Sequence, residues 1–189
     1  MTLVLGAIAV DAVVLGADSR TEVWVITGDA VRSGGTLCDR KLFKVERVGI
    51  ATYGAGPAGV RVPDVLASEL QPGWGVADAV NYLQPRCASV GDSMGALVGG
   101  LDDRGDALLV DLHMDGSAPR PIASAIGVPG AVVLRGVENS QRHQREPYTA
   151  AAIMAQMFEL LLAAAGNPAV GPPYEFLVIP RPAIALGPS

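Results

Sequence analysis

After Met1 the sequence reads TLVLGAIAVDAVVLGAD, residues 2–18, in which two apolar runs are separated by Asp11-Ala12. Both runs are rich in Val, Leu and Ile, which favour strands, and the break between them is short and polar. We therefore predict a β-hairpin whose second run returns beside the first, so that Asp18 lies near Thr2. Because the runs are apolar almost throughout, we expect the hairpin to be buried on both faces inside a layered fold.

The rest of the chain continues this pattern of strands and adds helices. Strands are expected at 23–27, 36–45, 48–53, 94–100, 107–112, 122–127, 174–179 and 184–186, with a loop at 33–35 and hairpin turns at 102–105 and 115–117. Helical spacing is found over 60–83, with a break at Pro72-Gly73, and over 129–137 and 147–165. Since strands and helices form separate blocks without a dividing linker, we predict an α+β fold in one domain, residues 1–189.

Composition narrows the classes of function. Of the 189 residues, 50% are hydrophobic and 17% are charged, which is enough apolar material for a packed core and excludes a disordered chain. The net charge of −5 and the lack of a basic run argue against a nucleic-acid or anionic-membrane partner. Two cysteines and two histidines form neither a disulfide framework nor a metal-ligand motif, so we expect no metal.

The longest apolar stretch, residues 150–165, is interrupted by Gln156 and Glu159 and is shorter than a membrane span of about 18 residues. No Lys or Arg precedes the first apolar run, as a secretory signal would require. We therefore expect a cytoplasmic protein without a membrane partner.

The candidate chemistry begins at Thr2. Removal of Met1 would give Thr2 both a hydroxyl and a free α-amine, whose ordinary pKa of ~8 lets it act as the general base for that hydroxyl. The 14 basic residues include only two lysines, Lys41 and Lys44, which suggests that a lysine is required where one is kept. Lys41, between Asp18 and the hydroxyl, would lower the hydroxyl pKa and relay its proton, which Arg cannot do. Alternatively, Asp18 is a turn residue and Lys41 an exposed strand end.

The chain resembles the β-type subunits of the proteasome, within the N-terminal nucleophile (Ntn) hydrolase family that includes the bacterial HslV peptidase. No single motif is specific, but the order and spacing of the matching segments extend over nearly the whole chain. These segments are residues 2–6, 11–20, 41–45, 49–56, 96–102, 108–111, 116–117, 126–127 and the last strand.

The resemblance implies a four-layer αββα sandwich, the Ntn-hydrolase fold, and a threonine-type endopeptidase subunit of a self-compartmentalising, homo-oligomeric ring. It makes Thr2 the nucleophile, with Asp18 and Lys41 as its partners, and it gives the oxyanion-hole N–H to Gly54. It also implies peptide or unfolded-protein substrates, an ATPase unfoldase as a further partner, and no cofactor. It puts Arg20 near the site in a structural role. Further candidates, for the lining of a substrate pocket, are Phe43, Thr52 and Gly56.

The chain also departs from the family pattern. Ile126 stands where the family usually has an active-site Ser, although Ser124 is near, and Asn167 and Val170 stand where it often has Asp and Ser. Those polar groups orient the amine of the nucleophile. A second hypothesis is therefore a catalytically weak or inactive structural ring subunit. A third is an Ntn amidase acting on a small molecule, which would not need a ring.

Overall fold

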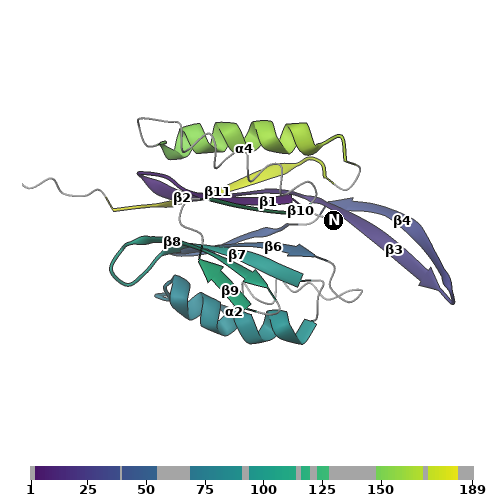
Figure 1. Ribbon diagram of the computed structural model, residues 1–189, viewed down its shortest axis with the longest axis horizontal. Helices are drawn as coiled ribbons and strands as arrows, with labels where there is room; N and C mark the ends of the chain where they lie inside the picture. Colours follow the sequence, from purple (N-terminus) through teal and green to yellow (C-terminus); the bar gives the residue numbers. More distant parts are fainter. Residues whose placement is uncertain are drawn as a thin grey trace, which may run out of the picture.

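The computed structural model describes residues 3–38, 40–54, 69–90, 94–113, 116–119, 123–127, 148–167 and 170–182. These residues form a mixed α and β structure built on two antiparallel sheets (Figure 1). The first sheet has the order β10 (Ala123–Gly127), β1 (Leu3–Ile8), β2 (Ala12–Asp18) and β11 (Tyr174–Pro180). The second has the order β5 (Leu42–Val45), β6 (Val48–Gly54), β7 (Met94–Leu101), β8 (Ala107–His113) and β9 (Gly116–Pro119). A separate ribbon is formed by β3 (Arg20–Thr27) and β4 (Ala30–Cys38), and it extends away from both sheets.

The two sheets face each other, and each carries a helix on its outer face (Figure 1). Helix α4 (Ala150–Ala164) covers the first sheet and helix α2 (Val76–Val90) covers the second. Side chains alternate accordingly along β1: Leu3 and Leu5 pack with α4, whereas Val4 lies in the core between the sheets. The predicted hairpin with two buried faces is thus confirmed, and β1 pairs with β2 in antiparallel register.

The turn between β1 and β2 also fixes the start of α4. The carboxylate Oδ1 of Asp11 accepts a hydrogen bond of 2.7 Å from the backbone N–H of Ala150. Thr149 is the N-cap, and its hydroxyl accepts a bond of 3.4 Å from the N–H of Ala152. Both oxygens satisfy amides that the first helical turn leaves without a partner inside the helix.

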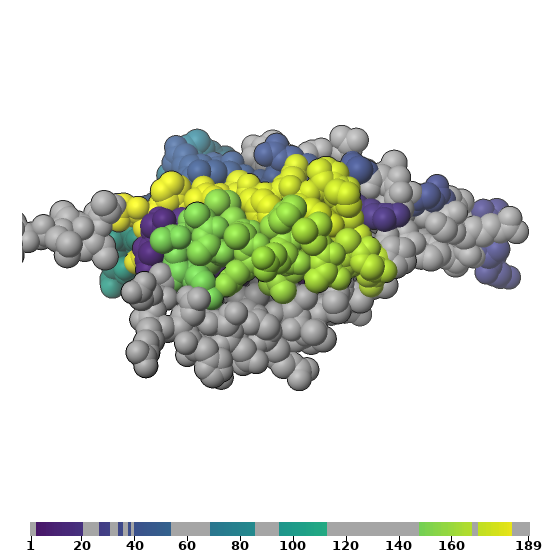
Figure 2. All heavy atoms as spheres, turned by 90° about the horizontal axis from the view of Figure 1, so that it is seen from above, coloured from purple at the N-terminus to yellow at the C-terminus, as the bar shows by residue number. Residues whose placement is uncertain are grey.

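Helix α4 lies along the edge strand β11, as the green and yellow surfaces in Figure 2 show. The Phe158 ring is 5.9 Å from the Tyr174 ring, edge to face, and 6.5 Å from the Phe176 ring. Phe158 and Leu162 nevertheless remain 44% and 49% exposed. Aromatic contacts therefore hold the helix over the edge strand while part of its apolar surface stays open in the single chain.

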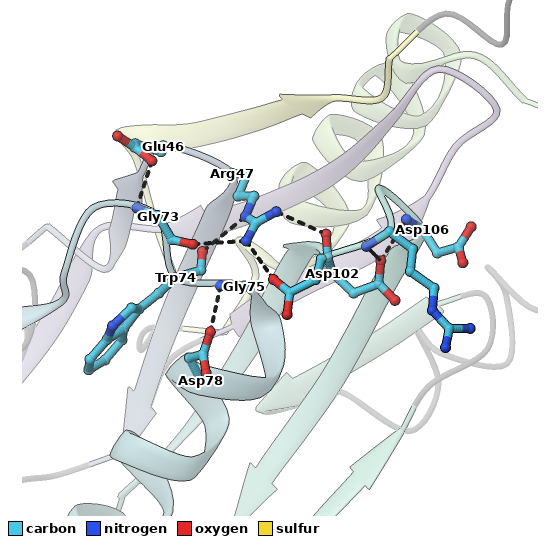
Figure 3. Close-up of polar contacts among 10 residues, drawn as sticks. Glu46, Arg47, Gly73, Trp74, Gly75, Asp78, Asp102 and Asp106 are labelled. Atoms are coloured by element: carbon cyan, nitrogen blue, oxygen red, sulfur yellow. Dashed lines mark hydrogen bonds and ion pairs between the residues drawn. The ribbon is translucent and has the colours of Figure 1, made fainter.

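A group of polar contacts, the Arg47 clasp, joins the β5–β6 turn to the start of α2 and to the β7–β8 turn (Figure 3). The Arg47 guanidinium donates to the carbonyls of Gly73 at 2.8 Å, Trp74 at 3.3 Å and Asp102 at 3.2 Å. It also pairs with Asp103 Oδ1 at 2.6 Å. One planar cation thus links three segments that are far apart in the sequence.

Two strand predictions in the ribbon region are wrong. The loop expected at residues 33–35 is part of β4, which continues through Gly35 at φ +111° with a register shift opposite Val23 and Trp24. The single strand expected over residues 36–45 is two strands, because the chain leaves the ribbon at Cys38 and joins the second sheet at Leu42. Glycine and a bulge let a strand pass an irregular position that sequence rules assign to a loop.

Smaller differences concern element ends. Helix α2 continues beyond Leu83 to Val90, through Pro85, and the turn expected at 115–117 begins strand β9 instead. The helix expected at 129–137, the edge strand at 184–186 and most of the helical region before α2 lie outside the described residues. No helix in the described part of the chain is long and apolar enough to cross a membrane.

Candidate active site

Asp18 is the centre of a buried polar cluster at the end of β2. Its side chain is fully buried, and among the described residues four donors surround its two oxygens. Oδ1 accepts from the Leu3 N–H at 2.8 Å and from Lys41 Nζ at 3.0 Å. Oδ2 accepts from the Arg20 N–H at 3.1 Å and from the Gly171 N–H at 3.4 Å. A carboxylate can be buried in this way because a cation and backbone amides replace its water.

Lys41 supplies the positive charge of this cluster. Its side chain is 6% exposed, and Nζ donates to Asp18 Oδ1 at 3.0 Å and to the backbone carbonyl of Arg20 at 2.6 Å. Lys41 directly precedes β5, and its carbonyl accepts a hydrogen bond of 3.0 Å from the Thr52 N–H in β6. This bond ties Lys41 to the second sheet. Of the two readings of Lys41, the exposed strand end is therefore wrong.

The fold brings these residues together through two antiparallel returns. The hairpin register pairs Val4 with Ala17, so Asp18 stands opposite the start of β1. The ribbon then leaves at Arg20 and returns at Cys38, its paired residue, and this return brings Lys41 back to the same point. The separation of 23 residues between Asp18 and Lys41 is thus spanned by a two-stranded ribbon whose root carries the cluster.

The loop after α4 contributes a donor that sequence reasoning did not identify. Gly171 donates to Asp18 Oδ2, and the Ser19 N–H donates at 3.0 Å to the Pro173 carbonyl, which aligns this loop with the end of β2. The available signal was Gly171-Pro-Pro173 directly before the last strand, since a glycine beside prolines marks a turn. Nothing in that signal says which side chain the turn contacts.

Two of the positions at which the chain differs from the Ntn-hydrolase pattern, Ile126 and Val170, lie in segments next to the cluster. Ile126 pairs with Val4 in the β1–β10 ladder, next to the pairing of Leu3 with Gly127. Val170 precedes Gly171 and is fully buried in the apolar core under α4. At this position the chain therefore has an apolar side chain that is part of the core.

Three predicted residues lie on the second sheet near Lys41. Thr52 is hydrogen-bonded to Lys41 through the backbone, and Gly54 is two residues further along β6, or ~6.6 Å. Phe43 follows Lys41 by two residues, and the Arg40 guanidinium lies 5.6 Å from its ring centroid. Phe43 and Thr52 are buried in this single chain, with 5% and 6% exposure, and their substrate-binding role stays a prediction.

Two predicted residues, Thr2 and Gly56, lie outside the described residues. Thr2 is joined by one peptide bond to Leu3, whose N–H binds Asp18, and consecutive Cα atoms are ~3.8 Å apart. Among the described residues, no group of three His, Cys, Asp or Glu side chains could hold a metal ion.

No protein family model and no curated protein matches the chain. A buried ammonium 3.0 Å from a buried carboxylate can stabilise negative charge and transfer a proton to a group beside it. The start of β1 is one of the segments that lie against this pair, since the Leu3 N–H binds Asp18.

Proposed function

We propose that the protein is a threonine-type peptidase of the Ntn-hydrolase class, with Thr2 as the nucleophile. The observation that carries the proposal is the buried Lys41–Asp18 pair, which binds the N–H of the residue directly after Thr2. A buried ion pair contributes little to stability by itself, so its position at the start of β1 favours a chemical role.

In the proposed mechanism, removal of Met1 frees the Thr2 amine. The amine takes the proton of the Thr2 hydroxyl, and Oγ attacks the carbonyl carbon of the scissile peptide. Lys41 relays this proton from the hydroxyl to the amine and stabilises the developing alkoxide, and Asp18 holds Lys41 in position. The N–H of Gly54 stabilises the oxyanion of the tetrahedral intermediate. The new amine of the cleaved peptide takes the proton from the Thr2 amine and leaves, and water then hydrolyses the ester that remains on Thr2.

The arrangement of layers supports the same class. A helix, two facing sheets and a second helix follow one another in Figure 1, which is the order expected for an αββα sandwich. From the family resemblance we propose a homo-oligomeric ring in the cytoplasm, acting on peptides or unfolded proteins that an ATPase unfoldase supplies. The exposed Phe158 and Leu162 on α4 are compatible with burial in such an assembly.

One observation favours a second candidate, a ring subunit without activity. Val170 is fully buried in the apolar core, where a catalytic family member has a serine near the amine. The site would then retain the Asp18–Lys41 pair without an oriented nucleophile.

Peptide hydrolysis by the purified assembly tests the proposal. Wild-type protein, Thr2→Ala and Thr2→Ser are compared on short fluorogenic peptides, after mass spectrometry has established that each has lost Met1. We expect Thr2→Ala to lose at least about 10³-fold in rate and Thr2→Ser, which keeps a hydroxyl, to retain part of it. Residual hydrolysis by Thr2→Ala would contradict the proposal. Light scattering measures the mass of the assembly and so separates a ring from an amidase that does not form one.

A further inference from the structure

Among the described residues of the loop after α4, Gly171 is the one whose backbone amide reaches Asp18. Gly171 N–H is 3.4 Å from Asp18 Oδ2, and the two prolines that follow have no N–H to donate. Val170, directly before it, is fully buried under α4, and its own N–H donates to the Asn167 carbonyl at 3.0 Å. The loop is thus anchored in the core on one side and reaches the carboxylate through one residue.

Gly171 also lies directly against Arg20. A Cβ atom at position 171 would be 3.0 Å from Arg20 Cδ, which is closer than ordinary van der Waals contact, and 3.4 Å from Nη1. The φ angle of Gly171 is outside the left-handed region, so backbone conformation does not require glycine here. The close approach of Arg20 is the feature that a side chain would disturb.

Arg20 in turn holds both members of the buried ion pair through its backbone. Its N–H donates to Asp18 Oδ2 at 3.1 Å, and its carbonyl accepts from Lys41 Nζ at 2.6 Å. The backbone N–H and carbonyl of Arg20 therefore fix the carboxylate and the ammonium relative to each other. A shift of this residue changes both bonds together.

We propose that Gly171 is a positioning residue for the Lys41–Asp18 pair, because the space left by its missing side chain lets Arg20 lie where its carbonyl binds Lys41. Gly171 contacts no reacting atom and acts through Arg20 and through its N–H to Asp18. The catalytic consequence rests on the proposed function, whereas the effect on Lys41 does not.

The test uses the fact that the chain has only two lysines. Lys41 is 5% exposed and Lys44 lies at the surface, so acetylation of Lys44 serves as an internal reference for Lys41. The ratio of the acetylation rate of Lys41 to that of Lys44 is measured by peptide mass spectrometry in wild type, Gly171→Ala and Gly171→Val. We expect the ratio to rise by roughly threefold in Gly171→Ala and by about tenfold or more in Gly171→Val, as the Arg20 carbonyl leaves Nζ.

Gly166 provides the matched control. It lies in the same connection after α4, its φ is also outside the left-handed region, and a Cβ there would have no neighbour within 4 Å. Gly166→Ala and Gly166→Val should leave the ratio within about twofold of wild type. An equal rise of the ratio in the Gly166 variants would show that the effect comes from general loosening of the loop, and it would overturn the proposal.

A double-mutant cycle tests the route through Arg20. In an Arg20→Ala background the side chain that position 171 would meet is gone, so Gly171→Val should raise the ratio by less than about threefold. The same tenfold rise with and without the Arg20 side chain would overturn the proposal. If Gly171→Val does not fold, as judged by circular dichroism, the cycle is run with Gly171→Ala.

Peptide hydrolysis separates this inference from the proposed function. Gly171→Val should lower kcat with little change in KM, since the pair acts after substrate binds. If wild type hydrolyses nothing while the lysine ratios behave as expected, the positioning role stands and the peptidase proposal falls. If wild type is active and the ratio does not change in either Gly171 variant, the positioning role falls and the peptidase proposal stands.

Discussion

The Lys41–Asp18 pair is buried, with side chains 6% and 0% exposed, whereas the Arg47–Asp103 pair lies at the surface, with side chains 32% and 82% exposed. Both pairs join segments that are distant in the sequence, and both cations also bind backbone carbonyls. They differ in the cation and in the surroundings. Arg47 holds turns together through a fixed planar fork, while Lys41 is a compact charge that can give up a proton.

The two pairs also differ in what they contribute to the net stability of the fold. An exposed pair costs little to form and contributes about 0–1 kcal/mol, and the clasp adds the carbonyl bonds of Arg47. A buried pair must first lose the water around both charges, so an apolar replacement would serve stability as well. The Arg47 clasp is therefore structural, and the Lys41–Asp18 pair fits a site whose chemistry uses the charge.

The largest expected effect separates the two cations by charge-conserving exchange. Lys41→Arg keeps the positive charge but cannot release a proton, so we expect peptide hydrolysis to fall by about 10²- to 10⁴-fold. Arg47→Lys, the reverse exchange in the clasp, should keep activity within about threefold. Steady-state rates of both variants are compared at equal concentration. A Lys41→Arg enzyme with more than a tenth of wild-type activity would remove the chemical distinction between the pairs.

Neutralising the carboxylate of each pair compares what the two pairs contribute to the free energy of unfolding. Asp18→Asn leaves Lys41 buried without its counter-ion and turns an amide donor toward backbone N–H groups, so we expect a loss of about 3–5 kcal/mol in the free energy of unfolding. Asp103→Asn should cost less than about 1 kcal/mol. Urea unfolding at pH 7 measures both. Equal losses in the two variants would show that burial does not set the difference.

The smallest expected effect concerns the clasp alone. Arg47→Ala removes the bonds to the carbonyls of Gly73, Trp74 and Asp102 while water can still reach these groups, so we expect a loss of about 1–3 kcal/mol. Amide hydrogen exchange should speed up at the start of α2 and leave the Arg20 N–H protected. Loss of protection at Arg20 would mean that the clasp and the site are coupled, contrary to the account.

The part of the site that the sequence predicts correctly is the part set by strand pairing. Two apolar runs around a short break predict a hairpin, and that hairpin alone brings Asp18 opposite the start of β1. Lys41 was predicted from its residue type and the family resemblance, and its bond to Asp18 agrees with that prediction. The hairpin pattern is local in the sequence and the choice of Lys41 rests on its chemistry, so both can be recognised in a single sequence.

The parts that the sequence could not give depend on contacts between distant segments. Gly171 is 153 residues from Asp18, and no periodicity relates the turn after α4 to that carboxylate. The path of the ribbon was missed because Gly34 and Gly35 suggest a loop, whereas partner-strand pairing keeps them in β4. Val170 illustrates the same limit, since only the packing under α4 identifies it as a core residue.

The central claim is that the Lys41–Asp18 pair serves a nucleophile at Thr2, and labelling by a peptide epoxyketone tests it most directly. Intact masses of wild type and Thr2→Ala are measured before and after incubation with the probe. We expect both to have lost Met1 and wild type alone to gain the mass of one probe. Wild-type protein that has lost Met1 and still takes no probe would contradict the claim and leave the pair with a structural role.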